Sequence, residues 1–272
     1  MTRGWSGPSP EYVARTGSTN ADLVAALHSR ARSPLPPIPE GTVLVSDEQY
    51  AGRGRLERVW AAPPRAALTC SMVLRPESMA NGQWGWLPLV IGLGVLDGVR
   101  AVTSGSGGTD RMALKWPNDV VVDAPARDGS AGPRKLGGIL VERVQLGSEQ
   151  SPVVVAGIGL NVDQGAAELP TPVATSLRQE GVEVAREEVL AALMSSVLRR
   201  IQQWRSQEWA LDPLRREYSR ECLSVGSQVR VVRHAQPDFV GKGSAVDAEG
   251  RLVVTGVAGD LTISSGDVFH LR

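Results

Sequence analysis

The sequence contains little cysteine and little lysine. Its 272 residues include two cysteines, Cys70 and Cys222, which are too few and too far apart for a disulfide framework or a cysteine zinc site. Only three lysines occur, Lys115, Lys135 and Lys242, so most of the 29 basic residues are arginines. A reaction that needs an ammonium group therefore has few side chains to supply it.

An excess of charge of either sign is also absent, because 29 basic residues balance 29 acidic ones. Bulk affinity for nucleic acid or for an anionic membrane surface needs clustered positive charge. The composition therefore argues against both partners. A hydrophobic content of 42% is typical of a folded globular protein rather than a disordered one.

Long apolar runs and targeting signals are missing as well. Residues Met1–Pro10 lack the charged and then apolar pattern of a signal peptide. The longest apolar candidate, Leu87–Val99, is interrupted by Pro88 and Asp97 and falls short of the ~20 residues of a membrane span. These absences predict a cytoplasmic protein without a membrane-spanning segment.

Periodicity and turn residues predict the secondary structure of most of the chain. Helices are expected over Gly17–Leu27, Trp84–Val102, Ala185–Trp204 and Asp212–Glu221, and strands over Thr42–Ser46, Ala67–Leu74, Ala113–Trp116, Val120–Asp123, Leu136–Val144 and Val153–Leu160. The strands arrive as runs and hairpins rather than in strict alternation with helices. This order favours an α+β fold with a mixed, mostly antiparallel sheet.

The chain divides into three parts on composition. Residues 1–16 read as an N-terminal tail, and residues 17–222 as the main α/β domain. Residues 223–272 hold short β-type runs separated by Gly- and Asp-rich turns, which predict a small β-barrel or β-sandwich.

The segment Gly52–Trp60 contains three arginines, Arg53, Arg55 and Arg58, within six residues, interleaved with Gly52 and Gly54. Glycine lets the backbone approach a ligand closely, and the arginine fork recognises phosphate or carboxylate with two hydrogen bonds. An anion site is one interpretation. A solvated basic loop or a nucleic-acid patch is the other, and composition alone does not separate them.

Three further segments carry polar side chains at strand ends. In Lys115–Asp119 (KWPND), Asn118 and Asp119 could hold Mg²⁺ beside a phosphate, although a plain Asn-Asp turn is the commoner reading of such a pair. In Lys135–Glu142, a lysine precedes glycines inside a strand, which indicates either close approach of a ligand or an exposed edge lysine. Asn161 ends the strand that contains Gly157–Leu160.

A covalent nucleophile is not apparent. The three histidines are scattered, and no serine lies in a G-x-S-x-G setting. The segment Gly157–Leu160 lacks the third glycine and the β-α-β context of a dinucleotide fingerprint. Placed cations without a nucleophile suit nucleotidyl or acyl-adenylate chemistry, which depends on positioning and charge stabilisation.

The motifs occur together and in a fixed order: Gly17–Asn20 (GSTN), Glu48–Arg55 with Arg58 and Trp60, Lys115–Asp119 (KWPND), Lys135–Leu140 (KLGGIL) and Gly157–Asn161 (GIGLN). This pattern resembles the biotin–protein ligases over about residues 12 to 272. The resemblance implies a class II synthetase-like catalytic domain followed by a small SH3-like β domain.

The resemblance also implies a reaction. Biotin would be activated by ATP and Mg²⁺ as biotinyl-5′-AMP and transferred to a lysine of a biotin carboxyl carrier domain. It further implies a monomer or homodimer without nucleic-acid or membrane partners. Only 16 residues precede the GSTN motif, which leaves no room for the N-terminal DNA-binding domain of some relatives, so no repressor function is expected.

By motif, the resemblance assigns roles to individual residues. Lys135 and Arg55 would be catalytic. Biotin would be held by Ser18, Thr19, Asn20, Gln49, Arg53, Gly54, Arg55, Lys135 and Gly138. ATP and its phosphates would be held by Arg55, Arg58, Trp60, Asn118, Asn161 and Arg272, and Mg²⁺ by Asp119.

Two departures and two alternatives accompany the resemblance. The family usually has glycine at the position of Glu57, and the Gly- and Pro-rich stretch 124–134 is long for a hairpin, so it is expected to be exposed or disordered.

A lipoate–protein ligase would share the fold and the adenylate chemistry. A biotin-responsive DNA-binding repressor is the alternative of a different class, and neutral charge argues against it.

Overall fold

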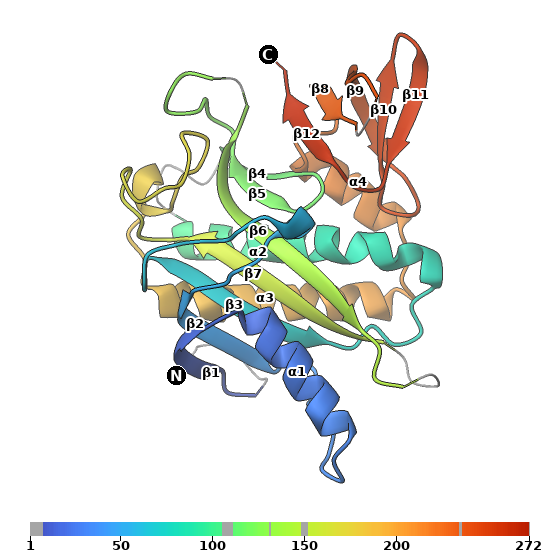
Figure 1. The fold of residues 1–272 in the computed structure, drawn as a ribbon. Helices are drawn as coiled ribbons and strands as arrows, with labels where there is room; N and C mark the ends of the chain where they lie inside the picture. The colour runs from blue at the N-terminus through green and yellow to red at the C-terminus, as the bar shows by residue number, and fades with distance from the viewer. Residues whose placement is uncertain (1–7, 105–110, 131, 148–151, 234–235, 272) are drawn as a thin grey trace.

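The computed structural model describes residues 8–104, 111–130, 132–147, 152–233 and 236–271. Two sheets organise these residues (Figure 1). The larger sheet has seven strands in the order β1-β2-β3-β7-β6-β5-β4. Only β1 and β2 run parallel, and every other neighbouring pair is antiparallel, as the sequence predicted for the main domain.

The elements of the larger sheet and its helices follow one another along most of the chain. They are β1 (Glu11–Thr16), α1 (Thr19–Ala31), β2 (Val43–Gln49), β3 (Ala67–Leu74), α2 (Leu87–Thr103), β4 (Met112–Lys115), β5 (Asp119–Val122), β6 (Arg134–Val144), β7 (Val153–Asn161), α3 (Arg186–Ser206) and α4 (Asp212–Glu221). Short 3-10 turns lie at Arg55–Glu57, Asn81–Trp86 and Arg178–Glu180.

The alternation of side chains along the strands gives the sheet two different faces. Helices α2 and α3 cover one face, where Val43 and Val45 of β2 enter the main hydrophobic core. Helix α1 packs on part of the other face through Leu23 and Leu27, against Leu44 and other strand residues. The rest of that second face is not covered by a helix, and it forms the floor of the pocket described below.

Among helices α1 to α4, α2 is the most apolar. The helical stretch Gly82–Thr103 is long and apolar enough to cross a membrane by length and composition alone, which corrects the prediction that no segment approaches that length. However, 67% of its most apolar window is buried inside the molecule. A Cβ on Gly94 would lie 2.7 Å from Cα of Val197, so α2 and α3 are packed in close contact. The stretch is therefore a core helix of this fold.

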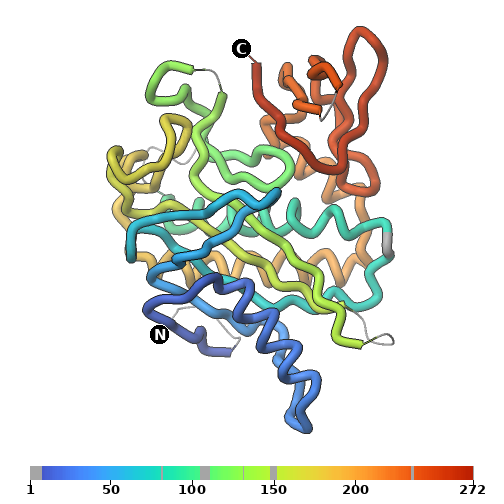
Figure 2. The backbone as a smooth tube through the Cα atoms, viewed as in Figure 1, coloured from blue at the N-terminus to red at the C-terminus, as the bar shows by residue number. Residues whose placement is uncertain are grey.

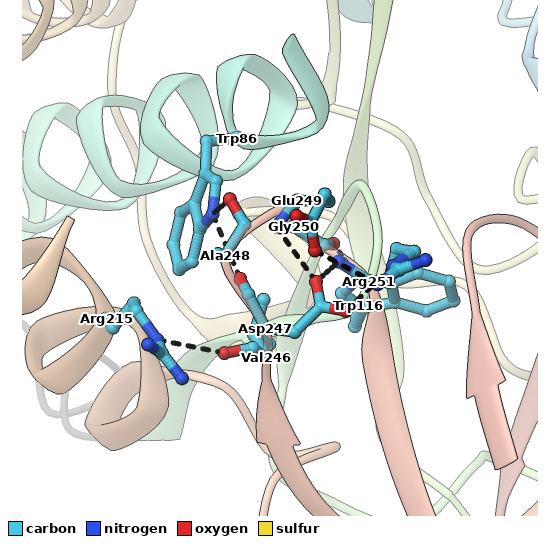
Figure 3. A network of polar contacts seen from close by, with 9 residues as sticks. All are labelled: Trp86, Trp116, Arg215, Val246, Asp247, Ala248, Glu249, Gly250 and Arg251. Atoms are coloured by element: carbon cyan, nitrogen blue, oxygen red, sulfur yellow. Dashed lines mark hydrogen bonds and ion pairs between the residues drawn. The ribbon is translucent and has the colours of Figure 1, made fainter. Parts of the chain in front are cut away.

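The second sheet is formed by five antiparallel strands in the order β11-β10-β9-β8-β12. They are β8 (Gln228–Val232), β9 (Phe239–Val246), β10 (Leu252–Gly256), β11 (Gly259–Ile263) and β12 (Asp267–His270). The turn between β9 and β10 is fastened to the larger sheet and its helices (Figure 3). Trp86 donates to the carbonyl oxygens of Asp247 and Ala248, and Trp116 to that of Gly250.

Two local predictions need correction. Residues Glu11–Thr16 belong to the region expected to be a tail, but they form β1, which pairs with β2. Part of the stretch 124–134 is not exposed, since Ala124 and Ala126 are buried, and Arg127 hydrogen-bonds Pro172 and Thr171. In both cases pairing with a distant segment decides the structure, and the local composition carries no sign of it.

Candidate functional site

A cavity of about 210 Å³ opens on the face of the larger sheet that α1 leaves uncovered. The segment between β2 and β3 crosses this face toward β6 and back (Figure 2). The KWPND turn and the start of β12 complete the walls. The cavity is therefore bounded by segments from both sheets.

The floor of the cavity depends on two glycines of β7. A Cβ on Gly157 would lie 2.3 Å from Oδ1 of Asn20, and a Cβ on Gly159 would lie 2.5 Å from Cε2 of Trp60. No side chain fits at either position without displacing its neighbour. The glycines of the GIGLN motif thus let Asn20 and the Trp60 indole lie directly against the strand.

The first turn of α1 presents a cluster of polar side chains at one end of the cavity. Ser18 caps the helix, because its side chain accepts a hydrogen bond from the backbone amide of Ala21. The amide and the hydroxyl of Thr19 both donate to Oε1 of Gln49, at 2.8 and 3.0 Å. Asn20 donates to the Glu142 carboxylate at 2.6 Å. These bonds fix the GSTN motif against the sheet.

The arginine segment has a strained backbone at its tip. Leu56 and Glu57 have φ angles of 54° and 60°, in the left-handed region that favours glycine. A glycine at position 57 would adopt this conformation without strain, whereas Glu57 adopts it at a conformational cost.

Three cationic side chains of the cavity, Lys135, Arg55 and Lys115, lie near the carboxylate of Asp119. Nζ of Lys135 is 2.6 Å from Oδ1 of Asp119. Burial lowers the pKa of Arg55, while the nearby Asp119 charge opposes that shift. Burial also lowers the pKa of Lys115, again opposed by Asp119. The cavity thus holds desolvated positive charge that a bound anion can neutralise.

The second sheet contributes a wall through β12. Arg58 forms an ion pair and hydrogen bond with the carboxylate of Asp267, which joins the arginine segment to this strand. The ring of Phe269 lies 6.0 Å from Nζ of Lys115. Asp267 and Phe269 both line the cavity.

Most of the residues assigned from the sequence lie in this one cavity. Those that line it are Ser18, Thr19, Asn20, Gln49, Arg53, Gly54, Arg55, Arg58, Trp60, Asn118, Asp119, Lys135 and Gly138. The structure brings them together from four segments of the chain, 18–20, 49–60, 118–119 and 135–138. Their individual roles toward biotin and ATP remain predictions.

Two assigned residues stand apart. Asn161 does not line the cavity, because its amide nitrogen donates to the carbonyl of Thr175 and its oxygen accepts from Gln164. This corrects the expectation that its side chain faces the ligand site. Arg272 lies outside the described residues.

Several lining residues were not assigned to the site from the sequence. They are Leu56, Val59, Thr69, Cys70, Lys115, Trp116, Pro117, Ile139, Leu140, Gly157, Ile158, Gly159, Gly266, Asp267, Val268 and Phe269. For Lys115, Gly157 and Gly159 the sequence offered a reason to expect a place in the site, because they belong to the motifs themselves. For Asp267 and Phe269 it offered no such reason, since a Gly-Asp turn before a short strand is common.

The comparisons with known proteins agree with this geometry. Residues 13–161 match the model of the Biotin/lipoate A/B protein ligase family. The chain is 41% identical, over 96% of its own length, to the biotin–[acetyl-CoA-carboxylase] ligase of Mycobacterium tuberculosis and spans 89% of that protein. The chain belongs to this family.

Two further relatives extend the comparison over nearly the whole chain. The biotin–[acetyl-CoA-carboxylase] ligase of Paracoccus denitrificans is 30% identical over 94% of this chain and 98% of its own. The solved structure of the biotin protein ligase from Aquifex aeolicus in complex with biotin and ATP superposes with a TM-score of 0.72 and 25% identity. That match covers 97% of this chain and 99% of the other, so it includes the second sheet.

Proposed function

We propose that this protein is an ATP-dependent biotin–protein ligase. It activates biotin as biotinyl-5′-AMP and transfers the biotinyl group to a lysine of a biotin carboxyl carrier domain. The observation that carries the proposal is the convergence of the GSTN, arginine, KWPND and KLGGIL motifs on one cavity. Family membership and the shared architecture of the relatives support the same chemistry.

In the first step, a carboxylate oxygen of biotin attacks the α-phosphorus of ATP. The bond from that phosphorus to the β-bridging oxygen breaks, and pyrophosphate leaves. Two anions must approach each other, so the barrier depends on fixed positive charge. Arg55 and Lys135 supply that charge within the cavity. Arg53 and Arg58 lie on the same loop as Arg55 and also line the cavity.

Biotin itself is assigned to the end of the cavity beside α1. Thr19, Asn20 and Gln49 offer hydrogen-bonding atoms there, and Gly157 lets Asn20 lie against the strand. The Trp60 indole lies against Gly159 at the floor of the cavity. These features suit a small ligand with a polar ring and an apolar chain.

In the second step, the amine of the carrier lysine attacks the carbonyl carbon of the mixed anhydride. The bond from that carbon to the phosphate oxygen breaks, AMP leaves, and the amine loses a proton. No enzyme nucleophile is required in this step. The cavity must hold the anhydride away from water until the carrier arrives.

Mg²⁺ fits this cavity as a companion of the ATP phosphates. No group of three or more His, Cys, Asp or Glu side chains able to hold a metal exists among the described residues. Asp119 supplies one carboxylate, whose Oδ1 is paired with Lys135. Magnesium commonly uses one or two carboxylates together with phosphate oxygens and water. Asp119 would hold Mg²⁺ through its carboxylate, and the ion would neutralise phosphate charge there.

The organisation of the chain follows from the same proposal. We assign residues 17–222, extended by β1, to a catalytic domain and residues 223–272 to a C-terminal domain that closes the nucleotide side. A cytoplasmic location and the absence of nucleic-acid partners are proposed with it. Lipoate is the alternative substrate, and the joint GRGR and KWPND motifs favour biotin over it.

A transfer assay tests the proposal. Purified protein is mixed with biotin, Mg-ATP and a carrier domain, and the mass of the carrier is measured. An increase by one biotinyl group is expected. Transfer with lipoate instead of biotin would replace the proposal by its alternative, and a matched carrier in which the target lysine is arginine provides the control.

A further inference from the structure

We propose that Glu180 is a positioning residue for Lys135. Its buried carboxylate acts through Arg134 and Thr175, which flank and fix the lysine backbone. The inference rests on the proposed function, because it concerns the adenylation step.

The carboxylate of Glu180 is almost completely removed from solvent, with a side-chain exposure of 1%. Arg134 places Nη2 3.1 Å from this carboxylate, and the Thr175 hydroxyl donates to Oε1 at 2.5 Å. Arg111 lies farther away, at 3.6 Å. A buried charge of this kind is costly unless its partners are held in place, so Arg134 and Thr175 are fixed with it.

The two partners of Glu180 are also the neighbours of Lys135. Arg134 precedes it in β6. Thr175 donates its backbone amide to the carbonyl of Lys135 at 2.8 Å, and the amide of Lys135 donates to the carbonyl of Val173 at 2.6 Å. Both backbone groups of the lysine are therefore bonded to the segment Val173–Thr175, which Glu180 holds from the side.

This support is needed because the sheet is irregular at Lys135. Strand β7 ends at Asn161, and its pairing with β6 begins only at Gly137. On the other side, the pairing of β6 with β5 shifts between Val120 and Val121, so Lys135 lies next to a bulge. The segment Val173–Thr175 takes the place that β7 leaves open.

The neighbouring residues Lys135 and Arg134 place their side chains in different surroundings. The side chain of Lys135 lies in the cavity beside Asp119, whereas Arg134 pairs with Glu180, which does not line the cavity. Glu180 therefore acts without touching substrate. A shift of the Lys135 backbone moves its ammonium group away from the reacting phosphate, and misplacement by about 1 Å can cost about 100-fold in rate.

The test is the rate of biotinyl-AMP formation in a single turnover with labelled ATP, at saturating biotin and ATP. Glu180→Gln keeps the size of the side chain but removes its charge. We expect the rate constant to fall about 10-fold or more, with apparent affinities for both substrates changed little. Glu217→Gln is the matched control, because Glu217 pairs with Arg200, and neither residue lines the cavity.

The decisive comparison is made in the Lys135→Ala background. If Glu180 acts through Lys135, Glu180→Gln causes no further loss there, because the group it positions is gone. Equal losses in both backgrounds, or a normal rate for the single variant, would overturn the inference. Absence of adenylation in the unmodified protein would instead overturn the proposed function.

A second variant covers the case in which Glu180→Gln does not fold. Thr175→Val removes the hydroxyl bond to Glu180 and leaves the backbone bond to Lys135. The same dependence on Lys135 is expected, with a smaller loss. A Thr175→Val loss that is independent of Lys135 would count against the inference.

Discussion

Nζ of Lys135 lies 2.6 Å from Oδ1 of Asp119, so an ion pair joins the KLGGIL and KWPND motifs across β5 and β6. The pair places the end of the lysine side chain beside a carboxylate inside the cavity. A phosphate or carboxylate that enters must compete with Asp119 for this ammonium, or Asp119 must turn to another cation. This arrangement makes Lys135 the centre of the proposed adenylation site.

Removal of that ammonium tests its role. For Lys135→Ala we expect adenylation to fall by about 100-fold or more, as on loss of a fixed charge donor. Lys242→Ala is a matched control, since Lys242 is exposed on β9 of the second sheet. Pyrophosphate release that depends on biotin is the measurement. Near-normal release by Lys135→Ala would remove the lysine from the mechanism.

The floor glycines provide a second test. In Gly159→Ala, the new methyl group would lie 2.5 Å from the Trp60 indole, so either the ring or the strand must move. We expect the Kd of biotin, measured by calorimetry, to rise about 10-fold, an amount equivalent to about 1.4 kcal/mol. Gly165→Ala serves as the control, because its new Cβ would meet only Glu168, at 3.5 Å. Unchanged affinity in Gly159→Ala would show that Trp60 does not shape the biotin site.

The ion pair between Arg58 and Asp267 links the arginine segment to the second sheet. Asp267→Asn is expected to raise the KM for ATP a few-fold, because a partly exposed pair contributes at most about 1 kcal/mol. A second ion pair, between Arg230 and Asp238, lies on the same sheet. Asp238→Asn, which disrupts that pair, is the control. Salt should reduce the difference between the two variants. An identical KM for ATP in the unmodified protein and in both variants would show that the second sheet does not contribute to nucleotide binding.

The stability of the fold should depend on pH through His270. Burial, and then the charge of Lys115, lowers the pKa of this imidazole from 6.5 to about 4. Between these values the unfolded chain binds more protons than the folded one, so the stabilisation is complete above pH 6.5 and is lost as the pH falls toward 4. His270→Asn should show a flatter decrease in the free energy of unfolding over this range. Parallel curves for the two proteins would contradict the shift.

Sequence reasoning succeeded where a local pattern determines structure. The buried run Ala67–Leu74 forms β3, and the proline at the first turn of Asp212–Glu221 marks the start of α4, both with the predicted bounds. The motif residues were found because glycine, arginine and lysine at fixed spacings are costly unless a ligand uses them. Their convergence on one cavity could be inferred only through the family resemblance.

Other features depend on contacts with distant segments, so the local sequence did not predict them. Strand β1 exists because residues Glu11–Thr16 pair with β2, and the polar sequence alone resembles a tail. Asp267 lies at the cavity through the placement of the second sheet, to which the bonds of Trp86 and Trp116 with the β9–β10 turn contribute. The proposed role of Glu180 likewise depends on its contact with Arg134, 46 positions earlier in the chain.

The most direct test of the central claim is biotin-dependent adenylation followed by transfer. The protein is incubated with labelled ATP, Mg²⁺ and biotin, the nucleotide products are separated, and a carrier domain is then added. We predict that biotinyl-5′-AMP and pyrophosphate form only with biotin, and that the carrier then gains one biotinyl group as AMP is released. No biotinyl-5′-AMP, or formation of an adenylate only with lipoate, would contradict the account.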